Sequence, residues 1–268
     1  MLKILIITQD DPFYIPIFFK ELFSRQFAEK FQLIGVIIQA PFGKKSIKKL
    51  FKQMLGFYGF KNIVAIGLRY LIYKVMAVLA TKIFQGKFPG VFSTRHILLK
   101  KGYDIIDLGN INSKESIELI NKLKVDVIFS VAASQIFKNE ILDLPRLGCF
   151  NIHTSKLPKN RGMMPNFWSL YNFDKDPISA ISIHKMNEKL DDGKILVQEE
   201  FRLNPNESLD NLIRRTKKLS VDVFLKAVDQ INRDSFNYLE NDSSKSTYNT
   251  FPTREDVLKF ETKGLKLL

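Results

Sequence analysis

Asn151 and His153 are the residues of this sequence whose types and spacing first suggest chemistry. They lie in CFNIH at residues 149–153, a short run typical of the end of a buried strand. Alternate residues of a strand point to the same face, so an amide donor and an imidazole would stand side by side. An acidic turn, LDDG at residues 190–193, follows downstream. A strand-end asparagine and a hydrogen-bonded core histidine are the simpler alternative, but the acidic turn favours a catalytic site.

The loop that follows this strand is rigid and basic. Pro158 restricts its backbone and Gly162 frees it. Three bases in the loop are expected to face outward or toward an anion, and they are Lys156, Lys159 and Arg161. A helix with Pro165 in its first turn is predicted next. Ligands of open α/β sheets bind at the carboxyl ends of the strands, which is where this loop begins.

The elements that must position these residues begin with a strand, a helix and a strand. Residues 2–8 form a continuous apolar run, residues 13–27 have helical apolar spacing, and residues 31–40 predict a second buried strand. This order predicts a right-handed parallel crossover and an α/β fold with a doubly wound, mostly parallel sheet. No glycine-rich phosphate fingerprint follows the first strand, so a dinucleotide cofactor is not expected.

Further strands and helices are predicted in a similar order along the chain. Strands are expected at residues 103–108, 125–133, 179–187 and 194–203, and helices at 92–101, 112–123 and 207–231. The helix near 112 would begin at Asn112 with Glu115 three residues on, a variant of the capping box. His184 alternates with apolar residues, so we expect it to have a structural role and not a catalytic one.

Length and composition indicate a globular chain with a sizeable core. The 268 residues are 45% hydrophobic, which argues against disorder. The one cysteine, Cys149, excludes an intramolecular disulfide and suits a reducing cytoplasm. The first residues place one lysine before a short apolar run and then acids, as in a strand and not in a signal peptide. We expect a cytoplasmic protein with a catalytic domain at residues 1–231 and a C-terminal extension at 232–268.

The formal net charge of +13 is concentrated in one segment. Of the 41 lysines and arginines, 14 lie in residues 30–103, which contain no aspartate or glutamate, so the rest of the chain has 27 bases and 28 acids. Any contact with nucleic acid or with a membrane would therefore be made by this segment. Within it, residues 41–92 are predicted to be a basic, apolar, helical insertion, because they are longer than an ordinary connection.

Charged residues interrupt the most apolar part of this insertion, residues 62–84. Arg69, Lys74 and Lys82 divide it into pieces shorter than the roughly 20 apolar residues that span a bilayer. We therefore expect no transmembrane helix. Three arrangements stay open: helices packed on the domain, which we somewhat favour, a homodimer surface, and a peripheral contact with anionic lipid at the inner face of the membrane.

The motifs around Asn151 resemble the signature of the folate-dependent formyltransferases. The family pattern is Asn-Ile-His, a Ser-x-Leu-Pro-x-x-Arg-Gly loop and an aspartate in a Leu/Ile-Asp-x-Gly turn, and all occur here in order. The resemblance spans about residues 2–231 and is strongest over residues 125–197. It implies a Rossmann-like sheet of the formyltransferase type and a catalytic trio of Asn151, His153 and Asp191.

The resemblance also implies how two substrates are held. The formyl donor would be 10-formyltetrahydrofolate, its pterin near the loop after the strand at 125–133 and opposite the turn at 187–192. The residues concerned are Ala133, Ser134, Gln135, Ile136 and Asp192. Acceptor contacts are expected from Asp10, Lys156, Arg161 and Met164, although a turn or helix cap is the simpler role for Asp10 and Asp11. No metal is expected, because the histidines, the cysteine and the scattered acids suggest no ligand cluster.

The implied reaction transfers the formyl group to a primary amine through a tetrahedral oxyanion. Asn151 would donate a hydrogen bond to the formyl oxygen, and His153 would do so with charge if Asp191 keeps it protonated. Asp191 would orient His153 and relay the proton of the amine. The competing activity is hydrolysis of the donor by the same trio. Proteins with that activity usually carry an extra domain before the catalytic one, whereas this chain starts at the first strand.

Three amines compete as the acceptor. A nucleotide-linked amino sugar for surface glycans such as lipopolysaccharide is favoured, because the chain is shorter than the methionyl-tRNA transferases and residues 247–260 resemble the tails of sugar-modifying members. Glycinamide ribonucleotide would need a small phosphate-binding loop where this chain has QDDP at residues 9–12. The basic segment favours methionyl-tRNA but the length does not, so nucleic acid is not expected as a partner. The non-enzymatic alternative is a basic membrane- or RNA-binding module on an inactive transferase fold, against which the intact trio argues.

Overall fold

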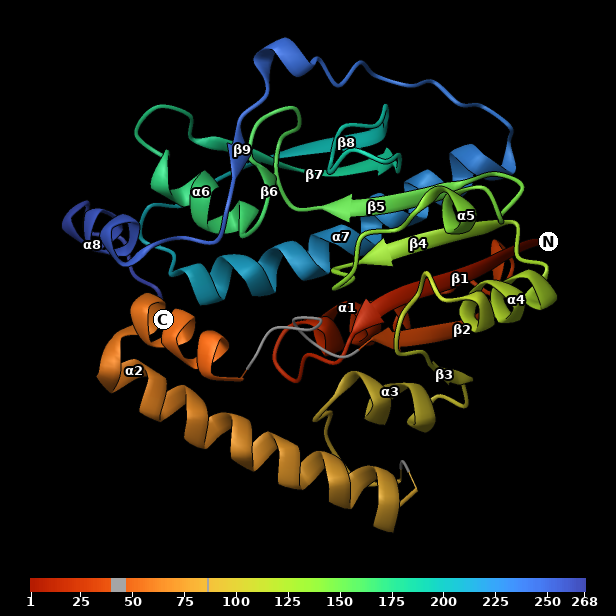
Figure 1. Cartoon of the computed structure of the whole chain (residues 1–268), viewed down its shortest axis with the longest axis horizontal. Helices are drawn as coiled ribbons and strands as arrows, with labels where there is room; N and C mark the ends of the chain where they lie inside the picture. Colours follow the sequence, from red (N-terminus) through yellow and green to blue (C-terminus); the bar gives the residue numbers. More distant parts are fainter. Residues whose placement is uncertain (40–46, 86) are drawn as a thin grey trace.

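Seven strands among the described residues form one twisted sheet (Figure 1). The computed structural model describes residues 1–39, 47–85 and 87–268. The strand order is β3-β2-β1-β4-β5-β7-β8. The parallel strands are β1 (Leu2–Gln9), β2 (Phe31–Gln39), β3 (Ile105–Asp107), β4 (Val127–Val131) and β5 (Cys149–His153), whereas β7 (Ile178–Lys185) runs antiparallel to β5 and to β8 (Ile195–Arg202). The predicted α/β, doubly wound, mostly parallel sheet is confirmed.

The central strand β1 builds the core on both faces of this sheet. Ile4 and Ile6 belong to one buried cluster with α1 (Ile15–Leu22), α3 (Thr94–Lys100) and α7 (Leu209–Asn232). Leu5 and Ile7 belong to a second cluster with α4 (Lys114–Leu123) and α5 (Asn139–Leu142). Alternate residues of a strand face opposite ways, so a continuous apolar run is what a strand covered on both faces requires.

The C-terminal residues return to the loop that follows β5. Their short strand β9 (Tyr248–Asn249) pairs in parallel with β6 (Arg161–Gly162) in that loop. The single-turn 3₁₀ helix η2 (Ser243–Lys245) precedes β9, and α8 (Arg254–Thr262) follows it. α8 packs with α6 (Pro165–Tyr171) and the start of α7 in a third apolar cluster. The tail therefore forms part of the wall around the carboxyl end of β5 (Figure 1).

α4 begins differently from its predicted capping box. Its N-cap is Ser113, whose hydroxyl accepts a hydrogen bond from the Ser116 N–H. Asn112, the predicted cap, instead accepts from the Lys138 N–H and donates to the Ile136 carbonyl. The prediction of Asn112 as the cap is therefore wrong, because its side chain ties α4 to the loop before α5.

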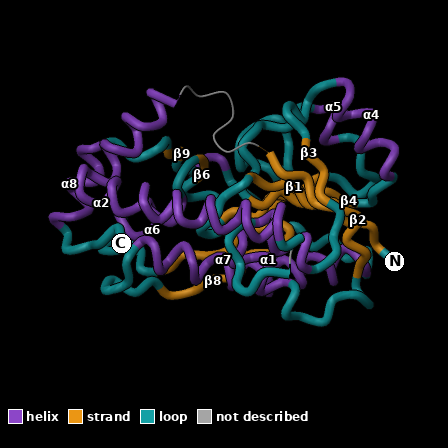
Figure 2. Tube along the Cα trace, turned by 90° about the horizontal axis from the view of Figure 1, so that it is seen from below, coloured by secondary structure: helices purple, strands orange, loops and turns teal. Residues whose placement is uncertain are grey.

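α2 (Ile47–Val78) lies along one side of the molecule, outside the helices that cover the sheet (Figures 1 and 2). Gly59 has φ +70° and ψ 169°, which no helix allows, so the helix is kinked there. The short π-helix η1 (Leu79–Ile83) continues it. The predicted helical, basic insertion is confirmed within the described residues.

The expectation that this insertion has no transmembrane helix stays a prediction. The helical stretch Phe51–Ile83 is long and apolar enough to cross a membrane by length and composition alone. Isolated lysines and arginines do not disqualify it, because an 18-residue window with few charges remains. Only 6% of that window is buried, so this part of the chain is not a core helix.

Candidate active site

Asn151, His153 and Asp191 meet at the carboxyl end of β5. The Asn151 amide donates to Asp191 Oδ1 at 3.2 Å, and His153 Nδ1 lies 3.6 Å from Asp191 Oδ2. His153 and Asp191 are both buried. The structure thus brings the three sequence-predicted residues together, although the separation of His153 and Asp191 is too long for a direct hydrogen bond.

The LDDG turn carries Asp191 to this cluster in a restricted backbone conformation. Asp191 has φ +53°, in the left-handed region, and its Oδ2 accepts from the Gly162 N–H at 2.8 Å. A Cβ on Gly193 would lie 1.7 Å from the Lys185 carbonyl oxygen, so only glycine fits the end of the turn. Side chains in sparsely populated backbone regions persist where surrounding contacts fix them, as they do here.

His184 is a member of the cluster that sequence reasoning did not place there. It pairs with Asn151 across β5 and β7, and its Nε2 lies 3.3 Å from Asn151 Nδ2 and 3.4 Å from Asp191 Oδ1. His184 Nδ1 lies 3.1 Å from the Lys185 carbonyl oxygen, which can only accept, so Nδ1 carries a proton. When the ring is neutral, Nε2 accepts from the Asn151 amide, and when it is protonated, Nε2 faces Asp191 Oδ1 as a donor. His184 and Asp191 together fix which end of the Asn151 amide faces them.

The hydrogen bond made by His153 Nε2 shows which ring nitrogen carries the proton. His153 Nε2 lies 2.9 Å from the Asn160 carbonyl oxygen and must donate to it. Burial lowers the pKa of His153, and the Asp191 carboxylate and the Asn160 hydrogen bond offset this only in part. His153 is therefore neutral at neutral pH, and its Nδ1 is a free proton acceptor. The expectation that Asp191 keeps His153 protonated is not supported by this geometry.

Asp191 is ionised. Burial raises the pKa of its carboxyl group, but the positive charge that His153 and His184 carry when protonated, together with the Gly162 N–H, outweighs burial and brings that pKa well below its usual range. A buried carboxylate beside a neutral imidazole is a pair that can take up and pass on a proton.

Arg161 is a buried clamp and not an open anion site. Its two terminal nitrogens bind Asp192, Ser243 Oγ at 3.2 Å, and both oxygens of Asn241 at 2.9 and 3.0 Å. All four terminal N–H groups are thereby used, so an acceptor would have to displace one of these partners, and the expected contact of Arg161 with the acceptor stays a prediction. Asn241 in turn donates to the carbonyl oxygens of Asp191 and Gly193, at 2.9 Å each. Arg161 thus holds the tail against the LDDG turn.

The two lysines of the same loop are also paired with carboxylates of the protein. Lys156 lies 2.7 Å from Glu200 and Lys159 lies 2.8 Å from Asp176. Both lysines remain partly exposed. An incoming anion would compete with these carboxylates, so a role for Lys156 in binding the acceptor stays a prediction.

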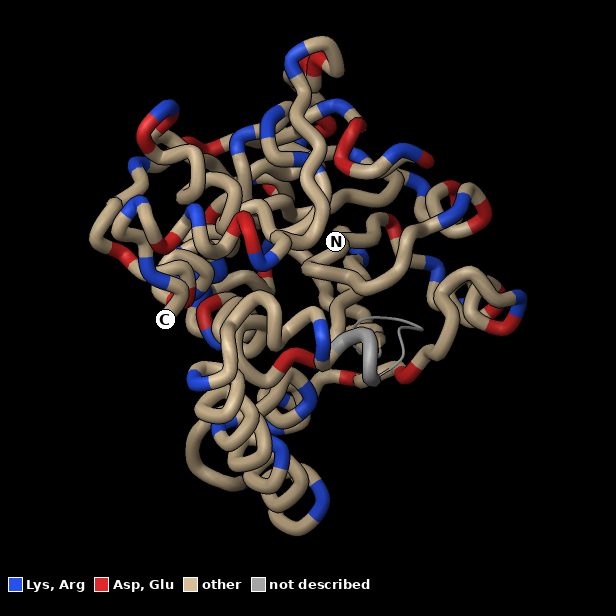
Figure 3. The backbone as a smooth tube through the Cα atoms, turned by 60° about the vertical axis from the view of Figure 1, so that its left-hand side comes forward, with Lys and Arg blue, Asp and Glu red and all other residues tan. Residues whose placement is uncertain are grey.

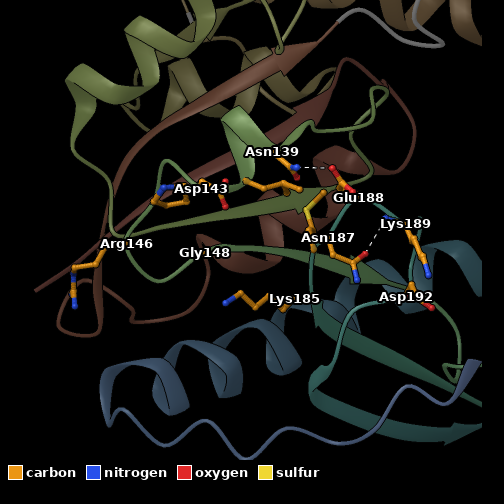
Figure 4. Close-up of a pocket in the computed structure, with 12 residues that line it drawn as sticks. Asn139, Asp143, Arg146, Gly148, Lys185, Asn187, Glu188, Lys189 and Asp192 are labelled. Atoms are coloured by element: carbon orange, nitrogen blue, oxygen red, sulfur yellow. Dashed lines mark hydrogen bonds between the residues drawn. The ribbon is translucent and has the colours of Figure 1, made fainter.

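A cavity of about 640 Å³ lies between α5, with the residues that follow it, and the turn at residues 187–192 (Figure 4). Asn139, Lys185, Asn187, Glu188 and Asp192 are among its lining residues, and Asn139 donates to Glu188 across it. Of the residues predicted to bind the donor, Asp192 lines this cavity but is bound to Arg161.

The other residues predicted to bind the donor shape the loop after β4. The Ser134 N–H donates to Gln39 Oε1, and the Gln135 side chain is bound to Gly109 and Ile111. Ile136 is 65% exposed, and Ala133 packs against the core. Any contact with a donor here would therefore come from the backbone and from Ile136.

The residues predicted near the acceptor are spread around the entrance to the site. Asp11, not Asp10, is the turn-forming residue, since its Oδ1 accepts from the Tyr14 N–H at 3.0 Å. Burial raises the pKa of Asp10, with Arg95 opposing this. Met164 has φ +55° at the start of α6 and packs in the third apolar cluster.

Lys217 on α7 is a further charged group that sequence reasoning missed. Burial lowers the pKa of Lys217, with Asp11 opposing this, and its charge also acts on His153. Lys217 lies within a long helical pattern, and nothing in that pattern indicates that it faces the site. In the part of the chain that the structure describes, no group of three or more His, Cys, Asp or Glu residues is arranged to hold a metal ion.

The middle of the chain matches a known protein family. Residues 101–228 match the protein family described as formyl transferase. The methionyl-tRNA formyltransferase of Thermotoga maritima is 34% identical over 149 residues, which are 56% of this chain and 47% of that protein. The bifunctional polymyxin resistance protein ArnA of Wigglesworthia glossinidia brevipalpis is 30% identical over 72% of this chain and 29% of its own length. The chain spans about half the length of the methionyl-tRNA formyltransferases that it matches.

Solved structures agree with this chain over more of its length. A 4-N formyltransferase from Francisella tularensis covers 93% of this chain and 76% of its own, with a TM-score of 0.55 and 22% identity. The N-formyltransferase of Helicobacter canadensis, solved with folinic acid and dTDP-3-aminofucose, covers 96% of this chain and 72% of its own, with a TM-score of 0.57 and 17% identity. At these identities the likeness establishes the fold. Residues 101–228 therefore match the formyl transferase family, and the chain as a whole has an α/β fold like that of the solved formyltransferases.

Proposed function

We propose that this chain is an N-formyltransferase that moves the formyl group of 10-formyltetrahydrofolate to a primary amine, most plausibly that of a nucleotide-linked amino sugar. The observation that carries the proposal is the cluster of the half-buried Asn151 with the buried His153 and Asp191 at the carboxyl end of β5. An ionised carboxylate, a neutral imidazole and an amide donor are the groups that acyl transfer to an amine needs.

The reaction requires one bond to form, one to break and one proton to move. The amine nitrogen attacks the formyl carbon, and the carbonyl oxygen becomes an oxyanion. The bond from the formyl carbon to the donor nitrogen then breaks, and the proton lost by the amine ends on that nitrogen. His153 Nδ1 and the Asp191 carboxylate are the proton acceptors of the cluster. Their 3.6 Å separation allows a proton to pass once the groups close up or a water bridges them.

Asn151 serves as the hydrogen-bond donor to the developing oxyanion. In the free protein its amide is directed at Asp191 Oδ1 and His184 Nε2, at 3.2 and 3.3 Å. Both contacts are long, and an oxyanion is a stronger acceptor than a neutral imidazole. One N–H is therefore redirected to the formyl oxygen as charge develops, while the second stays on Asp191 and keeps the amide oriented.

The donor lies against the loop after β4, opposite the turn at residues 187–192 that carries Asp191, as the family resemblance implies. The chain at residues 133–136 supplies backbone groups and the exposed Ile136 side chain to the pterin. A pterin ring presents both hydrogen-bonding edges and flat faces, which suits backbone groups beside an apolar residue.

The amino-sugar acceptor is supported by the part that the tail takes in the site, since coverage alone does not separate the acceptors: a phosphoribosylglycinamide formyltransferase from Anaplasma phagocytophilum also covers 93% of this chain. The solved sugar N-formyltransferases of Shewanella and Helicobacter canadensis cover 97% and 96% of this chain, so the likeness includes most of residues 232–268. In this chain those residues form β9 and hold the LDDG turn through Asn241. The matches to methionyl-tRNA formyltransferases cover 50–64% of the chain.

Methionyl-tRNA is the second candidate acceptor. It is favoured by the 34% identity to the Thermotoga maritima enzyme, which exceeds the identity to any of the sugar enzymes named above. The basic stretch at residues 30–103 is the surface on which tRNA phosphates would be neutralised. A cytoplasmic location fits either acceptor, and we propose it with the activity.

The deciding experiment incubates the protein with 10-formyltetrahydrofolate and either a panel of nucleotide-linked amino sugars or methionyl-tRNA. We expect a formyl mass gain on one nucleotide-linked amino sugar and none on the tRNA. A gain on methionyl-tRNA alone would keep the reaction and change the acceptor. Release of formate without any acceptor product would assign hydrolysis, and absence of any donor turnover would contradict the proposal.

A further inference from the structure

The outer side of α2 is an exposed apolar stripe. Its residues recur every three or four positions, so they lie on one side of the helix. Each is between 45% and 75% exposed, and they are Phe60, Val64, Leu68, Leu71, Val75 and Val78. The stripe is roughly 27 Å long at a rise of 1.5 Å per residue. Soluble monomers seldom leave a continuous apolar surface of this length uncovered.

The bases beside this stripe have no acids near them in the chain. Lys61 and Lys74 flank the stripe on opposite sides by helical spacing, and both are exposed. Lys82 follows at the end of the helix and is also exposed. Residues 30–103 contain no aspartate or glutamate, and Figure 3 shows the protruding helix with Lys and Arg positions but no acidic ones. The outer side of α2 is therefore both apolar and positively charged.

The inner side of the same helix is already packed on the molecule. Phe57 is buried against Phe167 and Phe251, with ring centroids 5.7 and 5.2 Å away. Farther along, the Arg69 guanidinium lies 5.1 Å from the Phe13 ring, and the Tyr73 ring lies 5.5 Å from it. α2 is thus held on the body of the protein, and the exposed stripe is the side left over after its contacts are made.

We propose that the outer side of α2 binds the surface of an anionic lipid bilayer, with the helix lying in the plane of the interface. The apolar stripe enters the boundary between headgroups and acyl chains, and Lys61, Lys74 and Lys82 reach up to the lipid phosphates. A second copy of this chain would bring one acid-free basic helix against another, so charge complementarity favours lipid over self-association.

A peripheral arrangement also fits better than a membrane span. To cross the bilayer, α2 would have to leave its contacts with Phe13 and Phe167 and take Lys61, Arg69 and Lys74 into hydrocarbon. Lying flat, the helix keeps its inner contacts and exposes every charge to the headgroups. The proposal does not rest on the formyl transfer proposed above, because it concerns a different surface.

The test is flotation of the full chain with vesicles of phosphatidylcholine alone or with added phosphatidylglycerol. We expect binding to the anionic vesicles at low salt, little binding to the neutral ones, and release by high salt. Lys61→Glu with Lys74→Glu should weaken anionic binding at least tenfold, and Leu71→Ser with Val75→Ser should weaken it similarly. The matched control is Lys114→Glu with Lys122→Glu on α4, which makes the same change of charge and should bind as the parent does.

Three results would overturn the proposal. The first is no binding to anionic vesicles at low salt, and the second is an equal loss of binding in the α4 control. The third is a dimer, measured by light scattering without lipid, that Leu71→Ser with Val75→Ser dissociates, which would assign this face to a second copy. Formyl-transfer activity of each variant, measured without lipid, separates a failure here from a failure of the proposed function.

Discussion

The cluster at the end of β5 and the outer side of α2 differ in which side chains they bury. In the cluster, charged and polar groups are buried or half-buried. The carboxylate of Asp191 by itself contacts Asn151, Gly162 and both neighbouring imidazoles. On α2, leucines, valines and a phenylalanine are left in solvent. Buried polar groups held by several hydrogen bonds keep one geometry, whereas exposed apolar groups are stabilised only when another surface covers them.

The two regions therefore differ in what they need from outside the chain. The cluster is complete within the chain, so its geometry already limits the chemistry that it can do. The stripe on α2 is incomplete, because its stabilisation depends on a surface outside the described part of the chain. Substitutions should therefore be felt strongly in the first region and weakly in the second, unless lipid is present.

The largest effect is expected from Asp191→Asn. Asparagine keeps the shape and one acceptor oxygen but removes the charge beside His153, so formyl transfer should fall by about 10²–10⁴-fold while the melting temperature changes little. The measurement is single-turnover transfer with a thermal melt. The neighbouring Asp192→Asn is the matched control, since Asp192 binds Arg161 and not His153. A larger loss from Asp192→Asn would move the catalytic carboxylate to that residue.

The next largest effect is expected on stability, from Arg161→Ala. Removing this buried cation leaves the buried oxygens of Asn241 without their partner, which should cost about 1–3 kcal/mol of unfolding free energy. Denaturant unfolding measures it, with Lys159→Ala as the control, because that partly exposed pair should contribute less than about 1 kcal/mol. Equal losses in both variants would show that Arg161 is not a clamp.

The sequence indicated the trio because its geometry is local. Two residues two apart on a strand share a face, and the order of the Asn-Ile-His, basic-loop and LDDG motifs carried the family resemblance. The strands could be predicted for the same reason, since continuous apolar runs such as residues 2–8 describe strands covered on both faces.

The residues that were missed depend on contacts distant in the chain. His184 joins the cluster through the register of β7 against β5, which alternation alone does not fix. The bonds from Arg161 to the tail could not be predicted, because its partner Asn241 lies 80 residues downstream. The exposure of α2 followed from where the helix packs, so an apolar pattern could not distinguish a core helix from an uncovered one.

Acid should destabilise the protein through His153. Its pKa is lowered in the folded state, so below the ordinary value of 6.5 the unfolded chain binds a proton before the native protein does. Stability is therefore fully present above pH 6.5 and is lost as the pH falls toward the folded pKa, by at most about 1.4 kcal/mol per pH unit. Asp191, whose pKa is also lowered, adds a loss only below 3.8.

The measurement is denaturant unfolding between pH 7.5 and 5. His153→Gln should flatten the dependence on pH, because glutamine takes up no proton in either state. A variant that keeps the full slope would place the titrating group elsewhere and would undermine the description of His153 as a buried neutral imidazole.

A smaller effect is expected from His184→Leu. This change removes the acceptor that holds the Asn151 amide, a neutral hydrogen bond of about 0.5–1.5 kcal/mol, so the transfer rate should fall two- to tenfold. His184→Gln restores an acceptor near Nε2 and should recover part of the rate. If the leucine variant keeps full activity, His184 does not position Asn151.

The smallest effect is expected on the other side of the comparison, from Leu71→Ser on α2. Leu71 is 56% exposed, so its replacement should change the unfolding free energy by less than about 0.5 kcal/mol in the absence of lipid. Phe57→Ala is the matched variant on the inner side, where Phe57 is 1% exposed, and it should destabilise by about 3–5 kcal/mol. Denaturant unfolding compares the two. If Leu71→Ser destabilises the protein as much as Phe57→Ala, a second copy or another part of the chain already covers the stripe in solution, and the contrast between the two regions disappears.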